Sequence, residues 1–321
     1  ILKKFFELFG YNPDIGRILT VFIGVISIPA LSYLTFQIKK NSGYLLVAFL
    51  SSISWYLISY SQELRPYSLL FLFSILSVIF FFKLIDEDKK TINLNFFLFV
   101  LFSSLAAVTH IFFFIIVLSQ FIFLIVNKFE IKNYFYTKLF SVTLTPLIYL
   151  FVMYDFLILQ IQLSSQDWWI PQVELEFFIN FFFSRYFGSK IMGLIYLLVL
   201  IYLITTQRKT VFKLSSKYFF LLLILFFSYF LPLTYGLFRQ PILTDRYIIF
   251  VLIPILILIS SLIFEIKPKK VKNFLLTLLL FSTITNNYIE IFQREISKPE
   301  FKNTIKYIIN SKTNNNIFVL A

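Results

Sequence analysis

The sequence predicts an all-α, polytopic membrane protein of about ten transmembrane helices, and three observations lead to this fold class. Of the 321 residues, 59% are hydrophobic and the mean hydropathy is +0.84, whereas soluble domains are roughly 45–50% apolar. Apolar runs that approach the roughly 20 residues needed to cross a bilayer recur from one end of the chain to the other. The loops between these runs alternate between many and few basic residues, as expected when successive loops lie on opposite sides of a membrane.

Ten apolar segments are the predicted spans. Several are shorter than a standard span of roughly 20 residues, and only Thr109 and His110 separate the fourth from the fifth. The ten segments are 18–37, 44–60, 67–84, 95–109, 112–127, 138–156, 191–206, 218–235, 247–264 and 273–289.

Three further segments lie outside the predicted spans. Residues 1–17 are expected to form an interfacial amphipathic helix that ends at Gly10, followed by a turn, because apolar and charged side chains of residues 1–9 alternate at helical spacing. Residues 157–190 form a long loop within the transmembrane domain of residues 18–289. Residues 290–321 resemble the start of a soluble domain, with a helix near Pro299 and a first strand at 317–320.

The basic residues indicate the orientation of the chain. Sixteen lie in loops on one side, which is therefore expected to be cytoplasmic, and five lie in loops on the opposite side. The net charge of +13 is mainly this topology signal rather than a nucleic-acid patch. The sixteen are Lys39, Lys40, Lys83, Lys89, Lys90, Lys128, Lys132, Lys138, Arg208, Lys209, Lys213, Lys217, Lys267, Lys269, Lys270 and Lys272.

Composition and the two ends of the sequence set further bounds. The chain has no cysteine, which excludes disulfides, thiolate metal sites and cysteine nucleophiles. It begins with Ile1 and ends on an apolar run at Ala321, so both ends are expected to be truncated.

The segment Ser61–Tyr67 carries the first functional candidates, because a carboxylate and a guanidinium are costly to place beside a bilayer. Glu63 could act as a general base or a metal ligand, or could simply pair with Arg65. Arg65 could hold a phosphate with its planar fork, or could be an interfacial charge.

Other candidates lie in the remaining loops of the same, outer side. His110, the only histidine, could bind a metal or shuttle a proton, although a single histidine at a helix end is more often structural. Trp168 and Trp169, which follow Asp167, could stack on a sugar or anchor the chain at the interface. Arg246 and Tyr247 could hold a lipid phosphate or cap the ninth span.

Six elements together resemble the bacterial family 39-like glycosyltransferases of the GT-C class, which are related to protein O-mannosyltransferases and to the aminoarabinose transferase of lipid A. Their order and spacing fit the family across nearly the whole chain. Leu64 and Pro66 depart from the residues common in the family. The six elements are Leu8–Gly10 with Arg17–Val21, Ser61–Leu69, Thr109–Phe112, Trp169–Pro171, Asp245–Phe250 and Phe301–Val319.

The resemblance implies a membrane enzyme that transfers a sugar from a polyprenyl-phosphate donor to a lipid, glycan or protein acceptor on the outer face of the inner membrane, with a divalent metal as a possible cofactor. Glu63 and His110 would be catalytic and would hold the metal, and Arg65, Arg246 and Tyr247 would bind the donor phosphate. Asp167, Trp168 and Trp169 would belong to the sugar and acceptor loop. The family's principal carboxylate would lie upstream of Ile1, so this fragment is expected to be inactive.

Two other functions remain open from the sequence. A transporter or flippase of lipid-linked glycans would show internal repeats, broken helices and polar residues at the middle of the membrane. The predicted spans have few glycines and almost no charge there. A non-catalytic membrane scaffold is the third reading.

Overall fold

The computed structural model describes residues 7, 13–86, 93–129, 131, 134–163, 170 and 185–293. All regular structure in these residues is helical, and none of them forms a strand. The predicted all-α fold class is therefore confirmed for the part of the chain that the structure describes.

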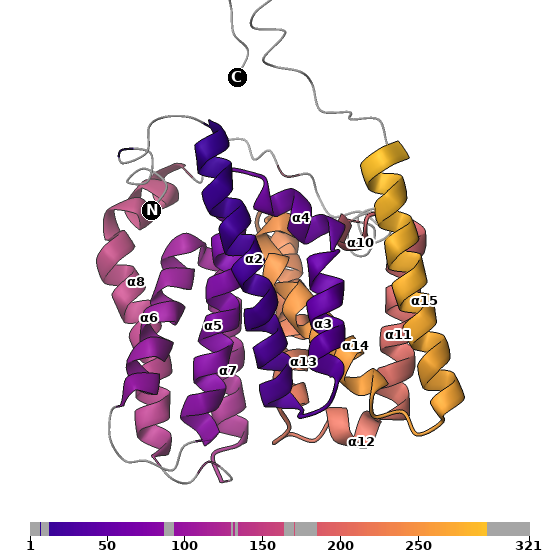
Figure 1. Ribbon diagram of the computed structural model, residues 1–321. Coiled ribbons are helices and arrows are strands. Elements are labelled where there is room, and N and C mark those ends of the chain that lie inside the picture. Colours follow the sequence, from indigo (N-terminus) through magenta and orange to yellow (C-terminus); the bar gives the residue numbers. More distant parts are fainter. Residues whose placement is uncertain are drawn as a thin grey trace, which may run out of the picture.

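The long helices form one bundle and run between its two ends (Figure 1). The short helices α4 and α10 lie at one end, called here the α4 end, and α12 lies at the other, the α12 end. The elements are α2 (Pro13–Ile38), α3 (Gly43–Ser52), α4 (Trp55–Ser61), α5 (Tyr67–Asp86), α6 (Leu94–Thr109), η1 (Ile111–Phe113), α7 (Phe114–Val126), α8 (Phe135–Leu163), α10 (Arg185–Phe187), α11 (Lys190–Thr206), α12 (Arg208–Val211), α13 (Lys217–Phe238), η3 (Asp245–Val251), α14 (Leu252–Ile263), α15 (Lys269–Tyr288) and the π-helical turn η4 (Ile289–Gln293).

Six of the described helices are long and apolar enough to cross a membrane, which indicates a multi-pass membrane protein. They are α2, α5, α8, α13, η3 with α14, and α15 with η4. A seventh span results if α3 and α4, which meet at a bend of 55°, are counted as one. Three further apolar helices, α6, η1 with α7, and α11, are shorter. Each of the ten predicted segments thus lies on a helix or on a broken helix.

Some boundaries differ from the predicted ones. Helix α2 begins at Pro13, so Pro13 and Asp14 belong to its first turn and not to a separate turn. Proline fits there because the first amides of a helix have no partner within the helix. Helix α8 continues to Leu163, so the predicted loop from residue 157 starts later than expected. The predicted soluble segment of residues 290–321 also starts later than expected, because residues 290–293 belong to η4 and continue the last candidate span. Its remainder from residue 294 and the predicted helix of residues 1–9, apart from Glu7, lie outside the described residues.

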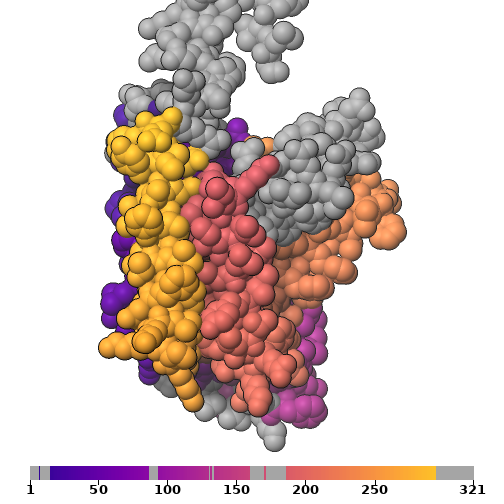
Figure 2. All heavy atoms as spheres, turned by 90° about the vertical axis from the view of Figure 1, so that its right-hand side faces the viewer, coloured from indigo at the N-terminus to yellow at the C-terminus, as the bar shows by residue number. Residues whose placement is uncertain are grey.

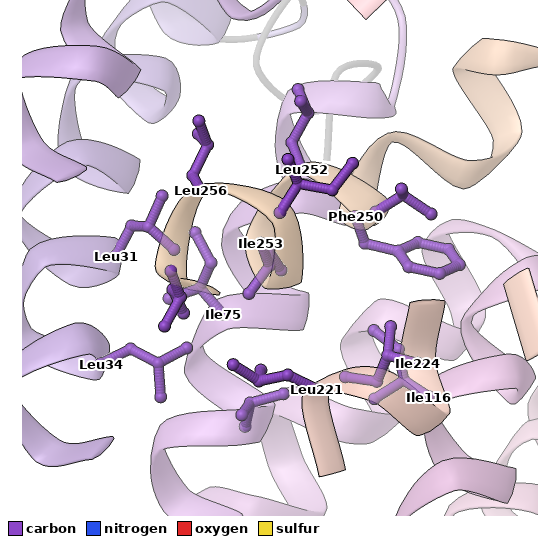
Figure 3. Close-up of a cluster of buried hydrophobic side chains, with 14 of the residues drawn as sticks. Leu31, Leu34, Ile75, Ile116, Leu221, Ile224, Phe250, Leu252, Ile253 and Leu256 are labelled. Atoms are coloured by element: carbon purple, nitrogen blue, oxygen red, sulfur yellow. The ribbon is translucent and has the colours of Figure 1, made fainter. Parts of the chain in front are cut away.

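Helix α14 is the centre of the bundle. Each of its residues from Leu252 to Ile263 is buried, as expected for a helix that is apolar on all sides. Figure 3 shows Phe250, Leu252, Ile253 and Leu256 surrounded by side chains of α2, α5, α7 and α13. These neighbours include Leu31, Leu34, Ile75, Ile116, Leu221 and Ile224.

Helices α11 and α15 lie side by side on one face of the bundle (Figure 2). They present large exposed apolar side chains, among them Ile191, Leu198, Phe274 and Phe281. In water such a surface would be unfavourable, whereas in a bilayer it meets lipid tails of the same polarity. The outside of the bundle therefore fits a lipid environment.

The α12 end collects the basic residues that were assigned to one side, as far as the structure describes them. Lys217 pairs with Asp86 at 2.6 Å and Lys39 with Glu265 at 3.3 Å. Lys138 is buried, and its Nζ donates to the Ile85 carbonyl at 3.0 Å. The predicted alternation of the loops thus matches the arrangement of the helices.

Candidate functional site

Four tyrosines form an aromatic group at the α4 end. Ser54 begins α4 as its N-cap and accepts a hydrogen bond from the Leu57 amide. Tyr56 and Tyr60 then lie one helical turn apart on the same face, and their ring centroids are 4.5 Å apart. Tyr186 of α10 packs against Tyr56 at 4.8 Å, and Tyr67 of α5 packs against Tyr60 at 5.3 Å. The group joins α4, α5 and α10.

Asp245 is held by two of these tyrosines. It is 9% exposed in the first turn of η3, where the positive end of the helix dipole favours a carboxylate. The Tyr60 hydroxyl donates to its Oδ2 at 3.4 Å, and the Tyr186 hydroxyl donates to its main-chain carbonyl at 3.0 Å. Burial raises the pKa of Tyr186, which keeps this donor protonated. The structure therefore adds Asp245, Tyr60 and Tyr186 to the predicted site.

Glu63 and Arg65 follow α4 directly and form an ion pair. The Arg65 Nε lies 3.7 Å from the Glu63 Oε2, and the two side chains are 52% and 28% exposed. An exposed pair of this kind contributes only about 0–1 kcal/mol to stability. The structure thus shows the ion pair with Arg65 that was one interpretation of Glu63 from the sequence. The Glu63 carboxylate is still partly accessible to a ligand.

Two guanidinium groups act on Tyr67. Arg65 and Arg246 both interact electrostatically with its hydroxyl, which is also partly buried. Arg246 also lies 5.7 Å from the ring centroid of Tyr247, a cation–π contact. The predicted phosphate-binding residues Arg65, Arg246 and Tyr247 therefore belong to one cluster.

His110 is packed into the same cluster. Its ring centroid lies 4.7 Å from that of Tyr247 and 6.3 Å from that of Tyr67. Its Nδ1 accepts a hydrogen bond from the Phe112 amide at 3.3 Å and so caps η1. Burial lowers the pKa of His110 from 6.5 to about 4, so the imidazole is neutral at neutral pH. A neutral ring with Nδ1 as acceptor carries its hydrogen on Nε2.

The predicted metal ligands are Glu63 and His110. Within the described residues, no three side chains of the His, Cys, Asp or Glu type lie close enough together to hold a metal ion. A metal on this pair would need further ligands from water or substrate, as carboxylate-bound Mg²⁺ often has. The pair therefore stays a prediction, as do Asp167, Trp168 and Trp169, which lie outside the described residues.

Comparisons with protein-family models, with curated proteins and with solved structures find no match to this chain. The function must therefore be argued from the site itself.

An apolar groove of about 550 Å³ adjoins the cluster. Ile111, Phe112 and Ile115 form one wall, and the end of α13 from Leu231 to Phe238 forms most of the other. Phe112 connects the groove to the cluster, because its ring lies 5.3 Å from Tyr247 and 5.4 Å from His110. The α4 end thus combines cationic groups with a neighbouring surface for an apolar chain.

Proposed function

We propose that this protein is a membrane glycosyltransferase that moves a sugar from a polyprenyl-phosphate donor to an acceptor at the outer face of the membrane. One observation carries the proposal: Arg65 and Arg246 both act electrostatically on the Tyr67 hydroxyl, beside a groove that is lined almost entirely by apolar residues. Paired guanidinium groups suit a phosphate, and the groove suits the isoprenoid chain attached to it.

The placement in the membrane is part of the proposal. The α12 end carries the basic loops and would face the cytoplasm, so the α4 end would face outward. All ten predicted segments would cross the inner membrane, the shorter helices α6, α7 and α11 included, because a bilayer thins locally around short spans at modest cost. The arrangement would then be of the GT-C kind that the six sequence elements suggest.

The proposed reaction inverts the anomeric carbon of the donor sugar. A carboxylate takes the proton of the acceptor hydroxyl, and the acceptor oxygen attacks the anomeric carbon. The bond from that carbon to the phosphate oxygen breaks, and polyprenyl phosphate leaves with the bonding electrons. Arg65 and Arg246 would stabilise the negative charge that develops on this phosphate.

Glu63 is the described carboxylate that we propose for the proton transfer, because it lies beside Arg65 and is partly exposed. A divalent metal on Glu63 and His110 would add positive charge near the leaving phosphate. Because Nδ1 accepts from the Phe112 amide and Nε2 carries the hydrogen, His110 would have to release this hydrogen bond and change tautomer before a ring nitrogen could bind the metal.

A transporter or flippase of lipid-linked glycans is the second candidate, and one observation favours it. Gln120 in the middle of α7 donates to Ser77 in the middle of α5 at 3.1 Å, and Ser77 bonds Ser103 of α6 at 2.8 Å. Buried polar groups at such a depth often mark transport paths. They also bind helices to one another in membranes, which agrees with the transferase.

The test uses the full-length protein in nanodiscs, with binding of a polyprenyl phosphate and transfer of labelled sugar as separate readouts. We expect Arg246→Gln to weaken polyprenyl-phosphate binding about tenfold, the loss of one charge-assisted contact. Lys190→Gln, an exposed cation at the same end, should bind like the wild type. We expect Glu63→Gln to reduce transfer and to leave binding unchanged.

Two outcomes would contradict the proposal. Equal affinity of Arg246→Gln and wild type for polyprenyl phosphate would remove the phosphate site. Accumulation of the labelled lipid-linked sugar in the opposite leaflet of proteoliposomes, without transfer to any acceptor, would instead support the transporter.

A further inference from the structure

A second cavity lies between α2, the bend from α3 to α4, and the start of α5. Its volume is about 220 Å³, far above the roughly 10–15 Å³ that one water molecule requires. It shares no lining residue with the apolar groove. The rest of its lining is apolar or glycine, and its polar lining is Ser27, Ser51, Ser52, Tyr60, Ser61, Gln62 and Ser68.

The bend of 55° between α3 and α4 creates this space, and Gly24 of α2 closes one side of it. A Cβ atom at Gly24 would lie only 2.8 Å from the Ser61 Cβ, so the end of α4 can approach α2 this closely only where a side chain is lacking. The cavity is therefore a consequence of specific residues rather than of loose packing.

The serine hydroxyls that line the cavity all donate their hydrogens to main-chain carbonyls. Ser27 and Ser61 donate to the carbonyls of Ile23 and Ile58 at 2.9 and 2.7 Å, and Ser68 donates to the Tyr60 carbonyl at 3.0 Å. Ser51 and Ser52 likewise donate to carbonyls of their own helix. A hydroxyl has two acceptor lone pairs besides its one donor, so these oxygens present acceptors to the cavity.

This lining selects the chemistry of a ligand. No charged side chain is among the described residues that line the cavity, so it offers neither a partner for an anion nor a carboxylate for a cation. A neutral molecule with several hydroxyl groups satisfies this lining, because its O–H groups donate to the serine oxygens and its oxygens accept from the Gln62 amide. A sugar or another polyol has such groups.

The surroundings of the cavity indicate how a ligand enters and what it meets. Val21 and Val25, on the exposed side of α2, are 39% and 56% exposed and line it together with the exposed Ser52, so the cavity opens toward lipid. On the inner side Tyr60 lines it and donates to Asp245. A ligand in the cavity would therefore lie against Tyr60, beside the arginine and tyrosine cluster that the apolar groove between α7 and α13 also adjoins.

We propose that this cavity binds the acceptor of the reaction, and that the acceptor is a lipid with a neutral polyhydroxylated headgroup, such as a glycolipid, which enters sideways from the bilayer. The role of acceptor rests on the proposed function, whereas binding of such a lipid to the cavity does not depend on sugar transfer. Donor and acceptor would then reach the cluster by separate lipid-facing entrances.

The test measures binding of two probes to the full-length protein in nanodiscs: monoglucosyldiacylglycerol for the cavity and a polyprenyl phosphate for the groove. We expect the double variant Ser27→Ala, Ser51→Ala to bind the glucolipid about tenfold more weakly, because two hydrogen bonds are lost. Ser52→Phe, an exposed position at the opening, should block it without disturbing the core. Neither change should alter polyprenyl-phosphate binding.

The matched control is Ser228→Ala, a buried serine of α13 that donates to the Ile224 carbonyl in the same way and should bind both probes normally. The proposal is overturned if the cavity variants bind the glucolipid like the wild type, or if they lose both probes equally. Free glucose that competes as well as the glucolipid would overturn entry from the bilayer. Selective loss of glucolipid binding in a protein that transfers no sugar would refute the proposed function and leave the cavity as a glycolipid site.

Discussion

The Tyr60 hydroxyl donates a hydrogen bond to the Oδ2 of Asp245 across 3.4 Å, and this contact joins residues 185 positions apart in the chain. It connects α4, which leads directly into Glu63 and Arg65, with η3, which carries Arg246. The two arginines that act on Tyr67 thus lie on, or directly after, helices that this hydrogen bond joins.

Removing this hydrogen bond should loosen the cluster. We expect Tyr60→Phe to reduce the free energy of unfolding by about 1 kcal/mol, the usual contribution of one hydrogen bond. Thermal unfolding in nanodiscs measures the change. Tyr33→Phe, at an exposed tyrosine of α2, serves as the control. If Tyr60→Phe and Asp245→Asn destabilise the protein additively in the double variant, the two residues are not coupled.

Gly188 should be irreplaceable, because its φ of +87° is rarely adopted by other residues. An added Cβ would also lie 2.5 Å from the Asn286 Nδ2, the atom that donates to the Phe187 carbonyl at 3.0 Å. We expect Gly188→Ala to destabilise the protein by about 1–3 kcal/mol, measured by thermal unfolding.

Gly236 is the matched control for this substitution. A Cβ there would meet the Pro241 Cα at an ordinary 3.4 Å, and alanine is the better helix former. Gly236→Ala should therefore be neutral or slightly stabilising. Equal effects of the two substitutions would show that the backbone at Gly188 does not require glycine.

His110 should make stability depend on pH. Its pKa is lowered from 6.5 to about 4 by burial, so between these values the unfolded chain binds a proton that the folded protein does not. Stability contributed by the neutral ring is therefore complete above pH 6.5 and is lost as the pH falls toward 4.

The variant His110→Asn isolates this effect, because asparagine retains an acceptor for the Phe112 amide but does not titrate. We expect the wild type to lose more thermal stability than the variant between pH 6.5 and pH 4.5. His110 is the only histidine, so no other imidazole contributes. Parallel pH profiles of the two proteins would argue against a buried neutral ring.

The groove should distinguish prenyl phosphates by chain length. Thr234 lines it, and Thr234→Trp should weaken binding of a long-chain polyprenyl phosphate several-fold, with little effect on a two-isoprene analogue. Thr205→Trp is the control, since Thr205 donates to carbonyls of its own helix in the same way but is exposed on α11. A similar loss for both chain lengths would mean that the groove does not hold the chain.

Much of the fold could be predicted from the sequence, because long apolar runs have few alternatives in a bilayer other than helices. The ten predicted segments all lie on helices, and the basic loops lie where the alternation placed them. The errors are at boundaries: α2 starts at Pro13 and α8 reaches Leu163, since polar and apolar residues are mixed at these ends and the hydropathy pattern does not mark the last turn.

The candidate site could be predicted only in part. Glu63 and Arg65 are only two positions apart, so the sequence itself shows them as two charges beside an apolar segment. Tyr60 and Tyr186 gave no such signal, because aromatic residues are abundant in this chain and only their position beside Asp245 distinguishes them. Asp245 was visible as an acid at the start of an apolar segment, but its burial was not.

The sequence by itself determined the all-helical membrane architecture, the alternation of the loops and the side on which the polar candidates gather, since these follow from the transfer of apolar residues into lipid and from the position of charges along the chain. Only the tertiary structure decided that Arg65 and Arg246 both act on Tyr67, that Tyr60 donates to Asp245, and that a groove and a cavity with several serines adjoin this cluster. Such contacts join residues far apart in sequence, and they depend on how helices bend, as at α3 and α4, and on where a glycine lets them approach.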